Sequence, residues 1–245
     1  MRRTAMVTVV LVAAFVMLQG PLADAKLGDI LKGLKGVVGG QGLSEARIVD
    51  GLKEALTIGT SNAVTVVSRV DGYYGNPKIR IPLPENVEKA ESILRTLGYG
   101  RKVDEFELSM NRAAEHAAPE AKALFVDAIK QMSIADARKI LEGRDNEATL
   151  YFKDKTYQRL EEIFKPIVRS SMSAVGVTSA YQSLDAKVRT VPFAERWTFD
   201  LDQYVTDKSL AGLFLMVAEE ERKIRANPAA RVTDLLKEVF GSVSR

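Results

Sequence analysis

Hydrophobic side chains recur with the period of an α-helix along most of the chain. Apolar residues stand three or four positions apart over 44–69, 86–97, 102–117 and 119–132, and glycines or prolines separate these runs. This spacing places the apolar side chains of each segment on one face of a helix. The first half of the chain is therefore predicted to form four helices.

The same pattern continues through the second half of the chain. Ser133 and Asp136 have the spacing of a capping box, which predicts the start of a short helix that ends at Gly143. A long helical run follows. Residues 206–226 are apolar on nearly every side, which indicates a helix at the centre of the fold. A weaker helical pattern covers residues 183–193, and a last helix is predicted to begin at Pro228 and to end at Gly241.

The long helical run covers residues 146–176 and contains Pro166, and residues 143–149 (GRDNEAT) lie at its start. This stretch lacks the alternating Asp/Asn spacing and the terminal Glu of a calcium-binding loop. We expect Asp145 or Asn146 to be the N-cap of the helix instead, because short polar side chains accept hydrogen bonds from its first backbone N–H groups.

One stretch between the first two helices breaks the helical pattern. Ile79, Ile81 and Leu83 alternate with polar residues and prolines, which predicts a short extended strap at 77–84 whose apolar side covers a pair of helices. The predicted fold is therefore all-α, a single domain of about eight helices in an irregular bundle with this one strap.

Residues 1–25 have the pattern of a secretory signal peptide. Arg2 and Arg3 precede an apolar run over 6–18, and residues 23–25 (ADA) form a small-x-small cleavage site. The apolar run is shorter than the roughly 20 residues that span a bilayer. We predict removal of this segment and export to the periplasm, with an uncleaved anchor as the alternative.

The composition narrows the classes of protein further. The chain has no cysteine, which excludes disulfides and a lipoprotein anchor, so its stability must come from a hydrophobic core. Its 35 basic and 32 acidic residues are interspersed, which argues against a nucleic-acid partner. Beyond the leader, no stretch is long and apolar enough to predict a transmembrane helix.

The predicted mature chain begins with an amphipathic, glycine-rich segment at 26–42, before a single all-helical domain over 43–245. One helical face of this segment is apolar and the other is basic, a pattern typical of a helix on an anionic membrane or a partner surface. Its glycines weaken the helix, so docking on the domain itself is the alternative. The residues of this predicted surface are Leu27, Ile30, Leu31, Leu34, Val38, Lys32 and Lys35.

A polar group on the third helix is the best candidate for a ligand site. An arginine beside an asparagine on an alanine-rich helix could receive an anionic group. The alternatives are a polar clamp, in which Arg112 pairs with Glu115 three residues on, and packing of the two adjacent tyrosines in the core. The candidate ligand-binding residues are Tyr73, Tyr74, Arg80, Asn111, Arg112 and Glu115.

The sequence offers little for catalysis. His116 is the only histidine, and its place near a helix C-terminus is better explained by the helix dipole than by a role as a base. Glu219, Glu220 and Glu221 are consecutive, so on a helix they fan out and cannot converge on one ion. We predict no catalytic residue, no metal site and no cofactor.

Several phrases together resemble one known family. They include GLKEALTIGTSNAV, MNRAAEHAAPEAKALFVDAIKQM, DARKILEGRDNEATLYFKDKT and AGLFLMVAEEERKIRANPAARVTDLLKEVFG, in this order. The chain is similar over residues 27–241 to the bacterial exported family known as domain of unknown function 4197. The resemblance implies an all-helical envelope protein and carries over no catalytic residue. Some members look like lipoproteins, and this chain departs from them because it lacks the cysteine.

Three functional hypotheses follow. The first is a non-enzymatic exported module that binds a partner, such as another envelope protein, or an apolar or anionic small ligand. The second is a hydrolase or lyase that uses carboxylates and Arg112 without metal-histidine chemistry. The third is a structural protein on the membrane surface.

Overall fold

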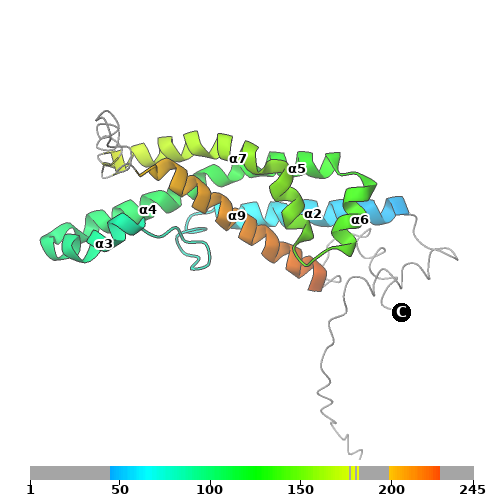
Figure 1. The fold of residues 1–245 in the computed structure, drawn as a ribbon, viewed down its shortest axis with the longest axis horizontal. Coiled ribbons are helices and arrows are strands. Elements are labelled where there is room, and N and C mark those ends of the chain that lie inside the picture. Colours follow the sequence, from blue (N-terminus) through cyan, green and yellow to red (C-terminus); the bar gives the residue numbers. More distant parts are fainter. Residues whose placement is uncertain (1–44, 177, 180, 182–198, 227–245) are drawn as a thin grey trace, which may run out of the picture.

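In the computed structural model, residues 45–176, 178–179, 181 and 199–226 are described, and they form helices and turns without any strand (Figure 1). The predicted all-α class is confirmed. The leader, the amphipathic segment at 26–42 and the predicted helices over 183–193 and after 228 lie outside the described residues. The elements are α2 (Glu45–Ser68), α3 (Glu85–Leu94), the π-helical turn η1 (Arg95–Tyr99), α4 (Gly100–Ala117), the 3₁₀ turn η2 (Ala118–Glu120), α5 (Ala121–Gln131), α6 (Ile134–Glu142), α7 (Glu147–Ser173) and α9 (Leu201–Ala226).

These bounds follow the predicted segments closely. The described residues contain seven α-helices, compared with the expected total of about eight for the whole chain. Ser133 and Asp136 form the predicted capping box at the start of α6, each side chain accepting a hydrogen bond from the other residue's backbone N–H. None of the helices in the described residues has the length and hydropathy to cross a membrane.

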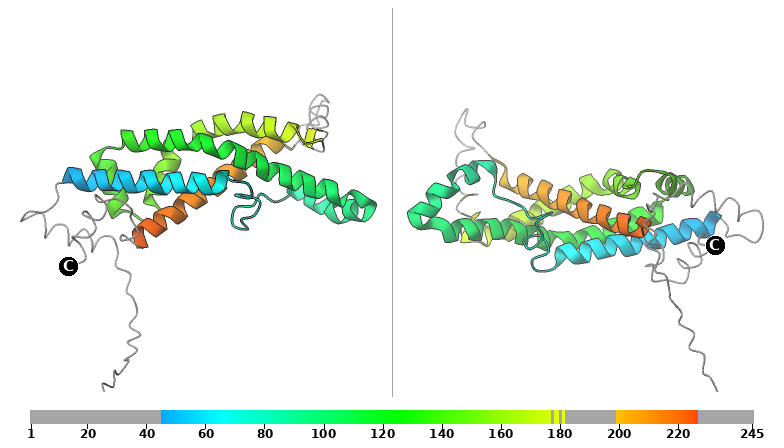
Figure 2. Two further views of the ribbon diagram at one scale, coloured as in Figure 1. Left: turned by 180° about the vertical axis from the view of Figure 1, so that it is seen from behind. Right: turned by 90° about the horizontal axis from the view of Figure 1, so that it is seen from below.

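Helix α9 is the central element of the bundle, as its apolar sequence predicts. It crosses the molecule diagonally and packs against α7, α2 and α4 (Figures 1 and 2). Its side chains at Leu210, Leu213, Phe214 and Val217 are buried, whereas Leu215 faces solvent. The helix is therefore less completely enclosed than the prediction of burial on nearly every side.

Aromatic side chains from three helices meet in the core. The ring of Phe125 on α5 lies edge-on to Phe152 on α7, with centroids 5.2 Å apart, and to Phe214 on α9, at 6.0 Å. Edge-to-face pairs of this kind add about 0.5–1.5 kcal/mol each to the free energy of burial. Apolar packing thus joins the helices without covalent links, as the cysteine-free sequence requires.

The α2–α3 connection, residues 69–84, runs between α4 and α9. Its strap alternates as predicted: Ile79, Ile81 and Leu83 are buried, and Arg80 and Pro82 are exposed. Residues 77–79 form a turn, so the extended part begins only after it. The connection contacts α9 through Tyr204, Glu219 and Met216 in addition to its contacts with α4.

Gly212 on α9 allows the connection to approach this closely. A Cβ at position 212 would lie 2.7 Å from Cε1 of Tyr73 and 3.1 Å from Cβ of Ile79. The Tyr73 ring is fully buried and has no room to move. The contact surface between α9 and the connection therefore requires glycine at this position.

Replacement of Gly212 by alanine is expected to lower the free energy of unfolding by about 1–3 kcal/mol, because the new methyl group overpacks a filled core. Denaturant unfolding of the purified variant measures this. The matched control is Gly176→Ala, where an added Cβ has no atom within 4 Å. An equal or smaller loss for Gly212→Ala than for this control would contradict the close packing.

Helix α3, turn η1 and the N-terminal half of α4 form a hairpin, here called the arm. It reaches beyond the other described helices at one end of the molecule (Figures 1 and 2). The chain reverses direction at Gly98, which has a φ of 87°. Glycine adopts this left-handed conformation without the steric cost that a Cβ would impose.

The predicted N-cap position of α7 is confirmed, but the expected capping hydrogen bond is not made. Asn146 occupies the N-cap position, but its side chain makes no capping hydrogen bond. Glu221 of α9 takes this role and accepts hydrogen bonds from the backbone N–H groups of Ala148 and Thr149, at 3.0 and 2.8 Å. A tertiary contact therefore replaces the local cap, and local sequence cannot indicate it.

Candidate functional site

The six predicted ligand-site residues come together where the α2–α3 connection lies along α4. Tyr73, Tyr74 and Arg80 come from the connection, whereas the polar group of 111–115 lies on α4. Turns pair some backbone groups of the connection with one another, and its other buried backbone N–H and C=O groups also need partners. Side chains of α4 supply partners for the backbone of Tyr73, Tyr74 and Ile81.

Glu115 is the first of them. One of its carboxylate oxygens accepts hydrogen bonds from the backbone N–H groups of Tyr73, at 3.0 Å, and Tyr74, at 3.2 Å. The other accepts from Arg112, whose second guanidinium nitrogen donates to Asp71 at 2.7 Å. Only 5% of the Glu115 side chain is exposed. Hydrogen bonding to Glu115, and then to Asp71, raises the pKa of Arg112 above its ordinary value.

Asn111 pairs with the strap in the manner of a neighbouring strand. Its side-chain oxygen accepts from the N–H of Ile81 at 2.8 Å, and its amide nitrogen donates to the Ile81 carbonyl at 2.9 Å. The same nitrogen donates to the carbonyl of Glu107 at 2.9 Å. This buried amide group thus satisfies the backbone of one buried strap residue completely.

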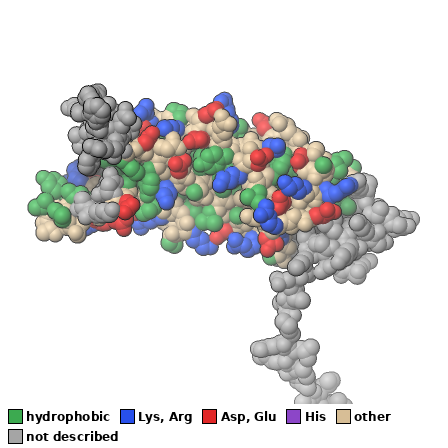
Figure 3. Space-filling model, viewed as in Figure 1, with side chains coloured by type: hydrophobic (Ala, Val, Ile, Leu, Met, Phe, Trp, Pro, Cys, Tyr) green, Lys and Arg blue, Asp and Glu red, His purple; other side chains and the backbone are tan. Residues whose placement is uncertain are grey.

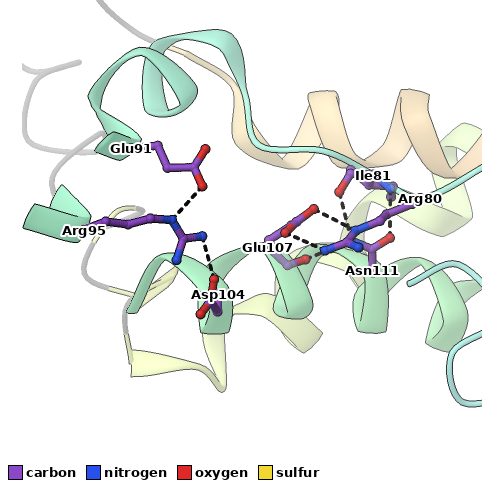
Figure 4. A network of polar contacts seen from close by, with 7 residues as sticks. All are labelled: Arg80, Ile81, Glu91, Arg95, Asp104, Glu107 and Asn111. Atoms are coloured by element: carbon purple, nitrogen blue, oxygen red, sulfur yellow. Dashed lines mark hydrogen bonds and ion pairs between the residues drawn. The ribbon is translucent and has the colours of Figure 1, made fainter. Parts of the chain in front are cut away.

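Arg80 closes the outer side of the contact (Figure 4). Its guanidinium donates two hydrogen bonds to the carboxylate of Glu107, at 2.9 and 2.8 Å, and lies 4.2 Å from the ring centroid of Tyr74. The bond to Glu107 is the main reason that the pKa of Arg80 is raised. A bidentate pair of this kind fixes the orientation of both side chains.

Tyr73 belongs to the core, and Tyr74 is half-buried at its edge. The hydroxyl of Tyr73 donates to the backbone carbonyl of Ser209 on α9 at 2.6 Å. Burial, and then the nearby charge of Glu115, raise the pKa of Tyr73 far above its ordinary value. The core-packing alternative therefore describes Tyr73.

The raised pKa of Tyr73 predicts a specific alkaline instability. In the unfolded chain this phenol loses its proton near its ordinary pKa of about 10, whereas in the folded chain it stays protonated. The unfolded state then binds fewer protons, so stability is fully present below pH 10 and falls as the pH rises. Tyr73→Phe is expected to reduce this slope by about 1.4 kcal/mol per pH unit above pH 10.

Urea unfolding of wild type and Tyr73→Phe at several pH values above 10 measures the two slopes. Tyr99→Phe is the control, because the side chain of Tyr99 is exposed. Identical slopes for the wild type and Tyr73→Phe would contradict the assignment.

The polar side chains of this contact, here called the clamp, are Asp71, Arg80, Glu107, Asn111, Arg112 and Glu115. They bond to one another or to the backbone of the connection. Arg112 holds two carboxylates and has no need of an external anion. The Arg112–Glu115 pair of the polar-clamp alternative is present, and the contacts of this arrangement fasten the α2–α3 connection to α4.

Sequence reasoning missed Asp71 and Glu107 of the clamp. A signal for Glu107 exists: Glu107, Asn111 and Glu115 stand four residues apart and lie on one stripe of α4. A polar stripe on a largely buried helix indicates that something polar is packed there. Asp71 belongs to a turn with no such periodicity, and its φ of 63° makes it unusual only once the backbone is known.

The other candidates lie apart from the clamp. His116 is exposed in the last turn of α4, with Nδ1 2.7 Å from Oγ of Ser171 on α7. Within the described ranges, no three acidic, histidine or cysteine side chains are grouped as metal ligands. The predicted membrane or partner surface at Leu27, Ile30, Leu31, Leu34, Val38, Lys32 and Lys35 lies outside the described residues.

Two of the surface grooves on the described part of the chain border α7. One, of about 520 Å³, lies around Pro166 of α7 and Gln203 of α9 and is lined mainly by charged and amide side chains. The other, of about 510 Å³, lies around Gly143 and Glu147. Both are open, charged surfaces, unlike the enclosed apolar pockets that hold most small ligands.

Comparison with known proteins gives one match. A family model described as protein of unknown function (DUF4197) matches residues 42–241. No curated protein matches the sequence, and no solved structure matches it.

Proposed function

The chain belongs to the DUF4197 family, and from this premise we propose that it is a non-enzymatic helical protein of the cell envelope that binds another envelope component at its surface. Export is part of the proposal and is supported by the signal-peptide pattern of residues 1–25. The proposed mode of action is contact with a larger partner rather than turnover of a small molecule.

The charged side chains of the clamp are paired with one another, and this pairing supports a non-enzymatic role. An enzyme that used Arg112 and carboxylates would need at least some of these groups free to meet a substrate. Arg112 is instead bound to Glu115 and Asp71, and Glu115 also holds two backbone N–H groups of the connection. This internal use of the charges disfavours the hydrolase or lyase hypothesis.

The exposed apolar end of the arm is the observation that carries the proposal. Three large hydrophobic side chains there face solvent: Ile93 is 62% exposed, Leu97 66% and Tyr99 57%. In Figure 3 hydrophobic side chains gather at this end of the molecule. Contiguous apolar surface of this kind marks a site of interaction with a protein or a membrane.

Native mass spectrometry of the protein purified gently from its own cell envelope tests the proposal. We expect the mature chain to carry lipid or a protein partner and no stoichiometric small metabolite. A single small molecule retained in most of the protein, and lost when Arg112 is replaced by alanine, would overturn the proposal in favour of a ligand-processing site at the clamp.

A further inference from the structure

A single glycine interrupts the helical path between α3 and α4. Leu94, with φ −61° and ψ −41°, and Gly100, with φ −52° and ψ −44°, have helical backbone angles on either side of it. Gly98, with φ 87° and ψ 7°, is the one non-helical residue inside η1, and Tyr99 next to it departs mainly in ψ, at 11°. Rotation at these two residues would therefore join Glu85–Ala117 into one continuous helix.

The turn at Gly98 is free of close packing. A Cβ added at this glycine would meet no atom within 4 Å, and the side chains of Leu97 and Tyr99 beside it are 66% and 57% exposed. The turn η1 contains no buried residue. A short turn between two elements is the kind of hinge at which identical segments exchange between copies of a protein. What holds the hairpin closed must therefore lie away from the turn itself.

The clamp prevents the hairpin from opening within one molecule. Asn111 holds the backbone of Ile81 through two hydrogen bonds, at 2.8 and 2.9 Å. In a continuous helix that rises about 1.5 Å per residue, Glu85 would lie about 39 Å from Asn111. The chain from Ile81 to Glu85 reaches about 14 Å at full extension. One molecule therefore cannot keep this clamp contact and also form the continuous helix.

We propose that two copies of the chain exchange α2, the connection and α3 (residues 45–97), so that α3 and α4 of each copy become one continuous helix. In the exchanged dimer, Asn111 of one copy binds the backbone of Ile81 of the other, and the clamp joins the two copies. The exchange concerns the assembly of the chain itself and does not depend on the envelope component proposed above.

The exchange keeps the contacts that stabilise the single molecule. Arg95 donates to Glu91 of α3 at 2.8 Å and to Asp104 of α4 at 2.7 Å (Figure 4). After exchange Glu91 remains on the same helix as Arg95, and Asp104 comes from the other copy. The remaining difference lies at the hinge, where a glycine inside a helix is unfavourable, and in the protein concentration, which favours the dimer. Gly98 thus sets the balance between the two forms.

Gly98→Ala changes this balance without creating a clash. Alanine resists the left-handed conformation and favours a helix, so the exchanged form is expected to gain about thirtyfold at each of the two hinges of the dimer. The purified protein is unfolded in urea, refolded at several concentrations and measured by size-exclusion chromatography with light scattering. We expect a dimer fraction that rises with concentration in the wild type and predominates in Gly98→Ala. Gly100→Ala is the matched control, because residue 100 is helical in both forms.

Two spin labels show whether such a dimer is exchanged. The chain has no cysteine, so Ser92→Cys with Glu105→Cys places one label on α3 and one on α4. In the hairpin the two helices pack together, with axes roughly 8–10 Å apart. In the continuous helix the two positions of one chain lie about 20 Å apart. When labelled Gly98→Ala is refolded with an excess of unlabelled Gly98→Ala, we expect the dimer to show only the longer distance.

Three results would overturn the exchange. The first is a folded Gly98→Ala variant, as judged by circular dichroism, that stays monomeric at every refolding concentration. The second is an equal dimer fraction in Gly100→Ala. The third is a dimer whose labels keep the short distance after dilution with unlabelled chain, which would identify association of closed hairpins. If Gly98→Ala does not refold, the wild type decides, and a wild type that is monomeric at all refolding concentrations contradicts the proposal.

Discussion

Replacement of Glu221 by alanine is expected to lower the free energy of unfolding by about 3–5 kcal/mol, the typical cost of removing one partner from a buried ion pair. Only 4% of this side chain and 14% of the Arg225 side chain are exposed. The variant would leave the mostly buried Arg225 without the carboxylate that lies 2.7 Å away in the wild type.

The same substitution would also remove the cap of α7. The backbone N–H groups of Ala148 and Thr149 and the Thr149 hydroxyl all donate to Glu221. Arg225 in turn donates to the carbonyl of Ile140 at 3.0 Å, so this one carboxylate organises the ends of α6, α7 and α9. The cost therefore includes unsatisfied donors at a helix N-terminus as well as a lost ion pair.

Chemical denaturation of wild type and Glu221→Ala measures the effect. The matched control is Glu219→Ala, two residues earlier on α9, which pairs with the exposed Lys78 and is expected to cost about 0.2–1 kcal/mol. Similar losses in the two variants would show that Glu221 is not the cap of α7.

Replacement of Glu115 by alanine is expected to have the second largest effect, about 2–4 kcal/mol, because it leaves two backbone donors without their acceptor. Two backbone N–H groups, of Tyr73 and Tyr74, would lose their acceptor, and Arg112 would lose its buried partner. Because the α2–α3 connection covers part of the core, its release would expose apolar surface as well. The midpoint of urea unfolding reports the loss of stability. The slope of the free energy of unfolding against urea concentration reports the change in exposed surface.

A double-mutant cycle separates the two contributions of Glu115. If the Arg112–Glu115 pair carries part of the cost, the effect of Glu115→Ala will be smaller in an Arg112→Ala background than in the wild type. Glu105→Ala, in an exposed pair with Lys102, is the control on the same helix. Fully additive losses for the two substitutions would contradict direct coupling within the clamp.

The helices and the strap could be predicted because their signals are local. Alternating burial of Ile79, Ile81 and Leu83 needs only the two-residue period of extended chain, and the capping box of α6 needs only Ser133 and its third neighbour. The six candidate site residues lie at one contact between the connection and α4. What the sequence could not decide was whether their charges face a ligand or one another.

The missed features depend on contacts between distant parts of the chain. Glu221 lies more than seventy residues from Ala148, whose N–H it accepts, and nothing in the spacing of either segment links the two. The requirement for glycine at position 212 likewise depends on Tyr73, far earlier in the chain. Such contacts follow from how helices cross, which periodicity alone leaves open.

The exposure of the end of the arm escaped prediction for a different reason. Its helices show ordinary amphipathic spacing, and that pattern predicts burial of Ile93 and Leu97 against the bundle. The chain instead reverses at Gly98 beyond the other described helices, which leaves both side chains in solvent. The disagreement between an apolar face and its exposure is what directs attention to this end of the molecule.

The central claim is that the polar residues of α4 fasten the α2–α3 connection rather than bind a ligand. Residue-resolved amide hydrogen exchange of the ligand-free protein tests it most directly. The account predicts that the N–H groups of Tyr73, Tyr74 and Ile81 exchange as slowly as those of the core helices, and that Asn111→Ala selectively accelerates exchange at Ile81. Rapid exchange at all three in the wild type would contradict the account, because it would mean that Glu115 and Asn111 are free to meet another molecule.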